Sequence, residues 1–318
     1  MISTAHVRRN SALAPHAALL AVQLIFGTWP IIGKIALRQL PSTGLVTFRV
    51  VGAAVVFAIL RRTTRLVKIE RHSDYLRLAL YSLLGVVLNQ FLFVKGLALS
   101  TVINATLLGT AIPIFTLIVS VIIGRERLSV KKILGILLAI AGVIYLVNPT
   151  RADLQGGTGL GNFLLIANAT AYGAYIALSQ DVVKRYGALT VITWIFAFGS
   201  IATLPIGGFY LAQTPLQDVS LFVWLAIVYI ILVPTVAAYY LNAWSLERVA
   251  PSTVAAYIYL QPLIAFALAP LILGEHWNEH TWAAAVLIFS GVAVVTWDSR
   301  AKNRSANEVQ IVPARLSE

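Results

Sequence analysis

The sequence predicts an all-α, polytopic membrane protein, in which ten transmembrane helices form two inverted five-helix repeats around a central cavity. Three features lead to this prediction: the composition, the series of long apolar runs, and the placement of the basic residues between those runs. Of the 318 residues, 59% are hydrophobic and only 11% are charged, and the mean hydropathy is +0.84. Soluble domains carry about 25% charged residues, because their surfaces need polar cover. A bilayer removes that need.

The apolar runs have the length of membrane-spanning helices, which need about 20 mostly apolar residues. Only helices and closed barrels satisfy the backbone polar groups in lipid, and these runs are too long for barrel strands. The ten predicted spans cover residues 16–38, 42–60, 75–98, 101–123, 130–147, 158–180, 189–211, 219–243, 250–273 and 280–297.

The basic residues predict the orientation. If the N-terminus is cytoplasmic, most of the 24 lysines and arginines fall in inner loops or the tail, and the outer loops hold only Arg38 and Arg151. The positive-inside rule then predicts that both termini are cytoplasmic and that the number of spans is even. The net charge of +12 is therefore interpreted as a topology signal and not as a nucleic-acid surface. Arg8 and Arg9 precede an apolar run of full spanning length without a clear cleavage site, so we expect no signal peptide.

An internal repeat divides the chain. At one constant offset Pro113 aligns with Pro262, and a slightly shorter offset aligns Gly27 with Gly173. Further pairs are Glu126 with Glu275, Gly142 with Gly291 and Thr47 with Thr193. Each half holds five spans, and an odd number reverses the orientation of the second half, as in secondary transporters. We expect a cytoplasmic segment at 1–15, repeats at 16–150 and 151–298, and a disordered cytoplasmic tail at 299–318.

The order of short motifs resembles the EamA repeat of the drug/metabolite transporter superfamily. The first half carries Gly96-Leu97, Ser100-Thr101, Asn104-Ala105, Pro113 and Gly124 to Ser129, together with Phe26 to Trp29, Lys34 and Phe48-Arg49. The second half carries Gly173, Ala250-Pro251, Pro262, Gly274-Glu275 and Gly291. The chain departs from the family pattern at Phe26, where a tryptophan is usual, at Ile195, which aligns with Arg49, and in the loop from Glu275 to His280. The resemblance implies two five-helix halves around a central cavity and the export of amino acids or related metabolites. Relatives of that superfamily also carry sugars, nucleotide sugars and phosphate esters.

The candidate cavity residues are polar or aromatic side chains that occupy equivalent positions in the two halves. An amide at membrane depth is unfavourable without a partner, so Gln90 and Gln261 either face a cavity or bond a neighbouring helix. The aromatic residues either line the cavity or simply pack. The candidates are Phe26, Trp29, Asn89, Gln90, Phe93, Tyr172, Tyr175, Tyr239, Asn242, Tyr257 and Gln261.

Three cations fall inside predicted spans: Lys34, Arg49 and Lys95. We predict that they line an outer vestibule that attracts an anionic group such as a carboxylate. The alternatives are snorkelling of the two lysines to the headgroups and a structural hydrogen bond of Arg49, which lies deeper.

Glycine and proline inside spans interrupt helices and can serve as hinges of a carrier or as passive packing features. The hinge candidates are Gly109, Pro113, Pro234 and Pro262.

Acidic residues are missing from the predicted membrane interior. None of the 12 lies in the middle of a span, and the five histidines lie at span ends or in loops. Proton-coupled carriers usually relay protons through such groups, so we expect facilitated transport or a coupling route that the sequence hides.

An enzyme would need a nucleophile and a base close together, and no acidic residue, histidine or cysteine offers that pair inside the predicted membrane spans. The stretch His276-Trp277-Asn278-Glu279-His280 matches a zinc-peptidase motif, but it spans a short loop, and there is no cysteine. We therefore expect neither a metal nor a cofactor.

Together these features predict a carrier in a bacterial inner membrane, which exports or facilitates the movement of amino acids, aromatic or hydrophobic ones in particular, by alternating access. The alternative substrates are organic anions, sugars and phosphorylated metabolites. A channel or a scaffold is the competing class. The expected partners are the substrate and the bilayer, with no nucleic acid. A monomer is plausible, although the sequence does not determine the oligomeric state.

Overall fold

The computed structural model describes residues 3–64, 67–125, 129–147, 157–276, 278–291 and 293–294, without the side chains of residues 3–12, 132 and 147. The predicted segment 299–318, the repeat partner Glu126 and the outer-loop Arg151 lie outside the described residues. The whole described part is helical or forms turns and loops, and no strand occurs in it.

The helices of the first half follow one another with short connections. They are α1 (Ser3–Ala36), α2 (Ser42–Thr63), α3 (His72–Ser82), the π-helix η1 (Leu83–Leu88), α4 (Asn89–Leu99), α5 (Val102–Gly109), α6 (Ile112–Ile122) and α7 (Val130–Val147).

The second half has a similar series. It comprises α8 (Thr158–Tyr186), α9 (Ala188–Ala212), the short 3-10 helix η2 (Leu216–Asp218), α10 (Leu221–Ile230), the π-helix η3 (Ile231–Ala237), α11 (Ala238–Arg248), α12 (Pro251–Ala256), the 3-10 helix η4 (Tyr257–Leu260) and α13 (Gln261–Leu273). A further helical stretch covers residues 279–291.

Seven helical segments in the described part are long and apolar enough to cross a membrane. They are Leu13–Ala36, Ser42–Thr63, His72–Leu99, Val102–Ile122, Ala188–Ala212, Leu221–Arg248 and Pro251–Leu273. Large apolar side chains stand on the outside of these segments, for example Ile122 at 77% and Leu271 at 83% exposure. Such a surface suits lipid and would be unusual in water. The chain is therefore a multi-pass integral membrane protein, and the number of ten spans stays a prediction.

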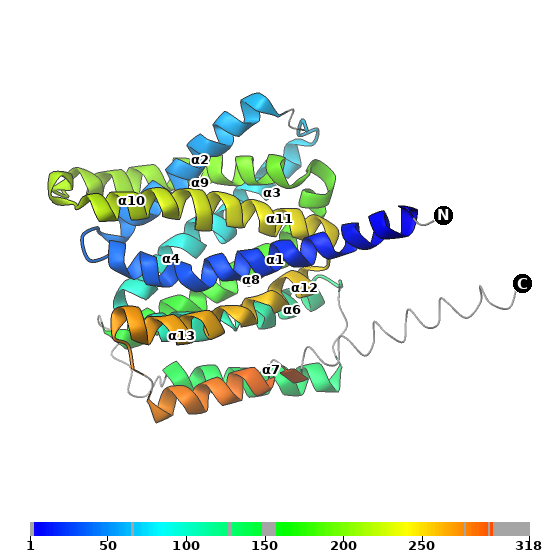
Figure 1. Ribbon diagram of the computed structural model, residues 1–318. Helices are drawn as coiled ribbons and strands as arrows, with labels where there is room; N and C mark the ends of the chain where they lie inside the picture. Colours follow the sequence, from blue (N-terminus) through cyan, green and yellow to red (C-terminus); the bar gives the residue numbers. More distant parts are fainter. Residues whose placement is uncertain are drawn as a thin grey trace, which may run out of the picture.

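The helices run side by side across the molecule (Figure 1). α2 packs along α9, α4 and α6 pack along α8, and α1 packs against α11 and α13. α7 lies at one edge of the view, where it contacts the stretch 279–291. There Gly142 meets Ile288, and Gly291 meets the backbone of Gly135 and Ala139. Close backbone approach at small residues is the usual way in which helices associate in membranes.

Interruptions occur at matching places in the two halves. The π-helix η1 separates α3 from α4, and η3 separates α10 from α11. In the following segments, Thr110 and Ala111 separate α5 from α6, while η4 separates α12 from α13. Pro113 and Pro262 stand in the first turns of α6 and α13, where proline is tolerated because those backbone N–H groups have no helical partner.

Close helix contacts also recur in both halves. Gly27 of α1 lies against Ile264 of α13, and Gly173 of α8 lies against Phe115 of α6. Both glycines and both partners are paired by the sequence repeat. The structure thus places equivalent residues in equivalent contacts, and these contacts hold α1 and α8 at the centre of the bundle.

Candidate functional site

The central cavity lies between α1, α2, α4, α5, α8, α11 and the α12–α13 segment, so both halves contribute to its wall. Its volume is about 70 Å³, which is room for a few water molecules. A solute of amino-acid size needs some side chains to move before it can enter. The lining residues are Gln23, Phe26, Trp29, Pro30, Arg49, Asn89, Gln90, Phe93, Ala105, Thr106, Gly109, Ile112, Asn168, Tyr172, Tyr239, Asn242, Ile258 and Gln261.

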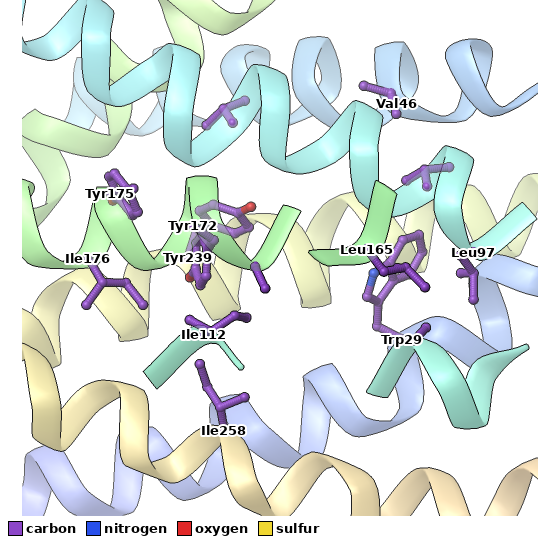
Figure 2. Packing of buried hydrophobic residues seen from close by; sticks show 14 of the residues in the cluster. Trp29, Val46, Leu97, Ile112, Leu165, Tyr172, Tyr175, Ile176, Tyr239 and Ile258 are labelled. Carbon is purple, nitrogen blue, oxygen red and sulfur yellow. The ribbon is translucent and has the colours of Figure 1, made fainter. Parts of the chain in front are cut away.

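Aromatic rings form one part of the wall. Tyr172 and Tyr239 lie close together, with Ile112 and Ile258 facing them from the neighbouring helices (Figure 2). The ring centroids of the two tyrosines are 6.3 Å apart in an edge-to-face arrangement. Phe26 stands edge-on to Tyr239 at 6.2 Å. Such rings give a cavity apolar surface and also a negative face that attracts cations.

The hydroxyl of Tyr239 is the centre of a hydrogen-bond network. It accepts bonds from Asn89 Nδ2 at 2.7 Å and from Gln90 Nε2 at 2.8 Å, and it donates to the carbonyl oxygen of Gly85 at 3.3 Å. Gly85 lies in the π-helix η1, which shifts the register of backbone bonding. Two amides and a backbone carbonyl of the first half are therefore joined to one tyrosine of the second half.

Asn168 extends this network, and two further amide hydrogen bonds lie elsewhere in the cavity wall. Asn168 donates through Nδ2 to the backbone oxygen of Asn89 at 2.8 Å and also to its side-chain oxygen. Asn242 donates to the hydroxyl of Tyr172 at 3.0 Å, and Gln261 donates to Gln23 Oε1 at 2.6 Å. Because buried amides need partners, these pairs fix the shape of the cavity. They also supply donors and acceptors that a solute can take over.

Arg49 of α2 forms the only cationic part of the described cavity wall. Its side chain is 2% exposed, its Nε donates to Thr235 Oγ1 at 3.1 Å, and its guanidinium carbon lies 3.8 Å from the centre of a Trp29 ring. Arg49 was predicted to line an outer vestibule. It lines the central cavity instead, on the side where α2 packs against η3.

Most of the predicted cavity residues meet around this one cavity. Those that line it are Phe26, Trp29, Asn89, Gln90, Phe93, Tyr172, Tyr239, Asn242 and Gln261. Tyr175 and Tyr257 do not line it. Tyr175 lies behind the wall, where its ring stacks on Tyr172 and contacts Gly85. The hydroxyl of Tyr257 is 2.7 Å from Nδ1 of His16, so this side chain faces α1 outside the cavity.

Gln23, Thr106 and Asn168 also line the cavity, although the sequence did not predict them. The predicted residues are polar or aromatic in both halves, whereas Gln23 aligns with Ala169 and Asn168 aligns with Val22. Gln23 and Asn168 could have been found as polar residues one helical turn before the predicted cavity residues Phe26 and Tyr172.

The hinge candidates all lie at interruptions of helices. Gly109 ends α5, Pro113 and Pro262 stand in the first turns of α6 and α13, and Pro234 lies inside η3. Gly109 also lines the cavity. Their role as hinges stays a prediction.

A second pocket of about 370 Å³ lies at the C-terminal end of α1. It is lined by Lys34, Leu37, Arg38, Ala98, Ser100, Thr101, Leu273 and Glu275. Lys34 donates through Nζ to the carbonyl oxygens of Leu97, at 2.7 Å, and of Ser100. A cation at these last carbonyls of α4 suits the negative end of the helix dipole. Lys95 is exposed and does not line either pocket, as expected of a snorkelling side chain.

Glu275 binds the start of α5 across the boundary between the halves. Its carboxylate accepts from the backbone N–H groups of Val102 at 2.8 Å and of Ile103 at 3.0 Å, while Thr101 Oγ1 accepts from Asn104. All three early N–H groups of α5 therefore have an acceptor. Lys34 and Glu275 together hold the break between α4 and α5.

Replacing Glu275 by alanine is expected to lower the free energy of unfolding by about 1–2 kcal/mol, because two N–H groups at a helix start lose their acceptor. Thermal unfolding of the purified protein measures this. Glu279→Ala is the control, since Glu279 is an exposed carboxylate four residues further along the chain. Equal melting temperatures for the two variants would show that the cap adds nothing to stability.

Metal-binding clusters are not found in the described part of the chain, where no three His, Cys, Asp or Glu side chains meet. His280 instead lies against the ring of Tyr145, with centroids 4.3 Å apart. The partly described motif around it thus contributes to helix packing.

A bundle of membrane-crossing helices around a cavity lined by amides, aromatic rings and one arginine has the build of a membrane transporter for small solutes. The family profile described as the EamA-like transporter family matches residues 14–148 and 159–297. The chain therefore belongs to this family, which confirms the resemblance found in the sequence, and the protein is a membrane transporter.

Proteins similar in sequence to this chain come from distant organisms. The chain is 26% identical to the uncharacterized inner membrane transporter YicL of Salmonella typhimurium, over 82% of this chain and 83% of that protein. It is 25% identical to the uncharacterized transporter YetK of Bacillus subtilis, over 89% and 86%. It is 26% identical to the WAT1-related protein At3g18200 of Arabidopsis thaliana, over 71% and 66%. A solved crystal structure shares the fold with a TM-score of 0.58 at 19% identity, over 92% of this chain and 99% of the other.

Proposed function

We propose that this transporter moves amino acids, in particular those with aromatic or large apolar side chains, as an exporter or facilitator that works by alternating access. One observation carries the proposal. The cavity formed by both halves combines aromatic rings with hydrogen-bonded amides and one arginine, and no acidic residue is among its described lining residues. Small-molecule sites are mostly apolar with a few placed polar groups.

A zwitterion with an apolar side chain fits this wall group by group. The carboxylate has the guanidinium of Arg49 as its partner. The ammonium group has amide oxygens of the Asn89 and Asn168 pair and the faces of Tyr172 and Tyr239 as partners. The apolar side chain can lie against Phe26 or Ile112. The three kinds of contact are available in one cavity.

Phosphorylated metabolites are a poorer match. A phosphate ester carries up to two negative charges, and carriers for such groups need several cations, whereas Arg49 is the single lysine or arginine among the described lining residues. Organic anions with one carboxylate remain the alternative substrate class, because they would use the same arginine. Sugars would use the amides and leave the arginine without a charged partner.

Inverted repeats would provide the alternating access. We propose ten spans with both termini on the cytoplasmic side of a bacterial inner membrane. The recurring π-helices and the recurring Gly–helix contacts support two equivalent halves, and the five spans predicted in each half support their opposite orientation. Rocking of such halves around a central site is the usual mechanism of carriers with this organisation.

Contacts between the halves are present at both ends of the bundle. At the predicted cytoplasmic end Asp74 of α3 binds Arg185 Nη1 at 2.9 Å and Tyr186 Oη at 2.8 Å, and Arg125 pairs with Asp181. At the predicted outer end Glu275 binds α5. In the proposed cycle the inner and the outer contacts open in turn, so that the cavity is reached from one side at a time.

Flux measurements in proteoliposomes test the proposed function. We expect saturable uptake of radiolabelled L-phenylalanine that unlabelled apolar amino acids compete with, while glucose and glucose 6-phosphate do not. Uptake should also proceed without a pH gradient, because the described cavity wall holds no acidic residue or histidine. Uptake of a sugar or a phosphate ester in place of amino acids would contradict the substrate class. Strict dependence on a pH gradient would contradict facilitated transport.

A further inference from the structure

We propose that Arg49 binds the carboxylate of the transported solute and that this carboxylate is the group by which the carrier selects its substrates. The inference rests on the proposed transport function and adds the chemical group that is recognised. It is carried by the environment of the Arg49 side chain.

Arg49 is a buried cation without a buried anion. It is 2% exposed and lines the cavity, and in the described part of the chain no carboxylate lies within 4 Å of its guanidinium. An unpaired charge at membrane depth is unfavourable. Such residues mark substrate or ion sites by default. A carboxylate on the solute would supply the negative charge that balances Arg49.

The guanidinium is held in a way that leaves its terminal nitrogens for a ligand. Thr235 takes the Nε–H at 3.1 Å, and the Trp29 ring lies 3.8 Å from the guanidinium carbon. Neither contact uses Nη1 or Nη2, and no hydrogen bond joins these two atoms to the described part of the chain. The two terminal N–H groups of arginine match the two oxygens of a carboxylate.

Thr235 lies within the π-helix η3, and a hydrogen bond to the backbone fixes its side chain. Its hydroxyl donates to the carbonyl oxygen of Ile230 at 2.7 Å, five residues back along the chain. Because its single proton is used there, the oxygen of Thr235 can only accept from Arg49. Thr235 is thus a positioning residue that aims the guanidinium into the cavity.

Arg49 also makes the cavity electrostatically asymmetric, because its equivalent in the other half is not charged. The sequence repeat aligns Arg49 with Ile195 of α9, and Ile195 is 1% exposed and does not line the cavity. The other polar lining groups are amides and hydroxyls without a full charge. A carboxylate therefore has one ionic partner, on the α2 side, and the rest of the solute extends toward Tyr239 and Tyr172.

Binding of three matched probes to purified protein in nanodiscs tests this inference by isothermal titration calorimetry. The probes are L-phenylalanine, 3-phenylpropionate, which keeps only the carboxylate, and L-phenylalaninamide, which keeps only the amine. We expect both carboxylates to bind at least about tenfold more tightly than the amide, which is the range of a charge-assisted pair. In Arg49→Gln this preference should disappear, while the affinity for the amide stays within about twofold.

Two further variants separate binding from folding. Arg49→Lys keeps the charge but not the two parallel donors, so the preference for carboxylates should shrink without vanishing. Thr235→Val removes the acceptor of Nε–H and should weaken the carboxylates more than the amide, whereas a purely structural defect would weaken all three probes alike. Thr235→Ser keeps the hydroxyl and should restore the preference.

The outcomes distinguish the inference from the proposed function. If the amide binds as tightly as L-phenylalanine, or if Arg49→Gln leaves the preference intact, the role of Arg49 is refuted and amino-acid transport still stands. If none of the three probes binds to the wild-type protein, the inference and the proposed substrate class both fail. If 3-phenylpropionate alone binds, the inference stands and the substrate is an organic anion.

Discussion

Replacing Gly173 by valine is expected to prevent the two halves of this transporter from packing correctly. A Cβ atom at Gly173 would lie 2.9 Å from the carbonyl oxygen of Ile112, 2.9 Å from Cβ of Phe115 and 3.0 Å from the amide nitrogen of Thr116. Two of these atoms belong to the backbone of α6, which cannot turn aside as a side chain can. α6 and α8 would have to separate, at a cost of about 3 kcal/mol or more.

Thermal unfolding followed by tryptophan fluorescence, together with the yield of monodisperse protein, measures this effect. Gly208→Val is the matched control, because Gly208 also lies inside a long helix but a Cβ there would meet nothing within 4 Å. We expect Gly173→Val to lose most of the folded protein and Gly208→Val to resemble wild type. A normal melting temperature for Gly173→Val would mean that α6 and α8 do not approach each other this closely.

Replacing Tyr239 by phenylalanine is expected to reduce transport strongly while leaving the protein folded. The hydroxyl is the acceptor for Asn89 and Gln90, and Asn89 keeps a second acceptor in the carbonyl oxygen of Gly85 at 3.0 Å. Gln90 has no such second bond within the described part of the chain. Leaving a buried amide unpaired costs about 1–3 kcal/mol. Since these amides shape the cavity, we expect the ratio of maximal rate to apparent affinity constant to fall at least about tenfold.

Tyr240→Phe is the control for that measurement, because Tyr240 is the next residue of α11 and does not line the cavity. Uptake of L-phenylalanine into proteoliposomes compares the two variants at equal amounts of reconstituted protein. Wild-type kinetics for Tyr239→Phe would show that the network is a packing feature without a part in transport.

Much of the helical architecture could be predicted, because lipid imposes simple rules on a sequence. Apolar runs of spanning length must become helices, since no water is available for their backbone groups. The predicted run 75–98 thus falls on α3, η1 and α4, and the run 219–243 falls on α10, η3 and α11. The π-helix η1 could not be foreseen, because its residues Leu83–Leu88 include no proline or other helix-breaking signal apart from Gly85.

The cavity could be predicted where both halves show the same signal. Gln90 and Tyr239 occupy equivalent positions, and the structure joins them by a hydrogen bond. Side chains that are polar in one half alone, such as Gln23 and Asn168, could not be found from a signal shared by both halves. The rotation of a helix about its axis could not be predicted either. Tyr257 therefore turned out to face His16, and Arg49 turned out to face the cavity, because packing against neighbours sets rotation and a single span does not encode it.

Single-cysteine labelling tests the central claim most directly, because the natural sequence contains no cysteine. Gly109 lines the cavity, and a side chain there would meet nothing within 4 Å, so Gly109→Cys places a thiol in the proposed site. Ala98→Cys in the second pocket, at the end of α1, is the control. Membrane-impermeant maleimide should modify Gly109→Cys in reconstituted vesicles, and saturating L-phenylalanine should slow that reaction at least about tenfold without slowing the reaction of Ala98→Cys. If no transported solute protects Gly109→Cys, or if both thiols are protected alike, the cavity between the two halves is not the substrate site.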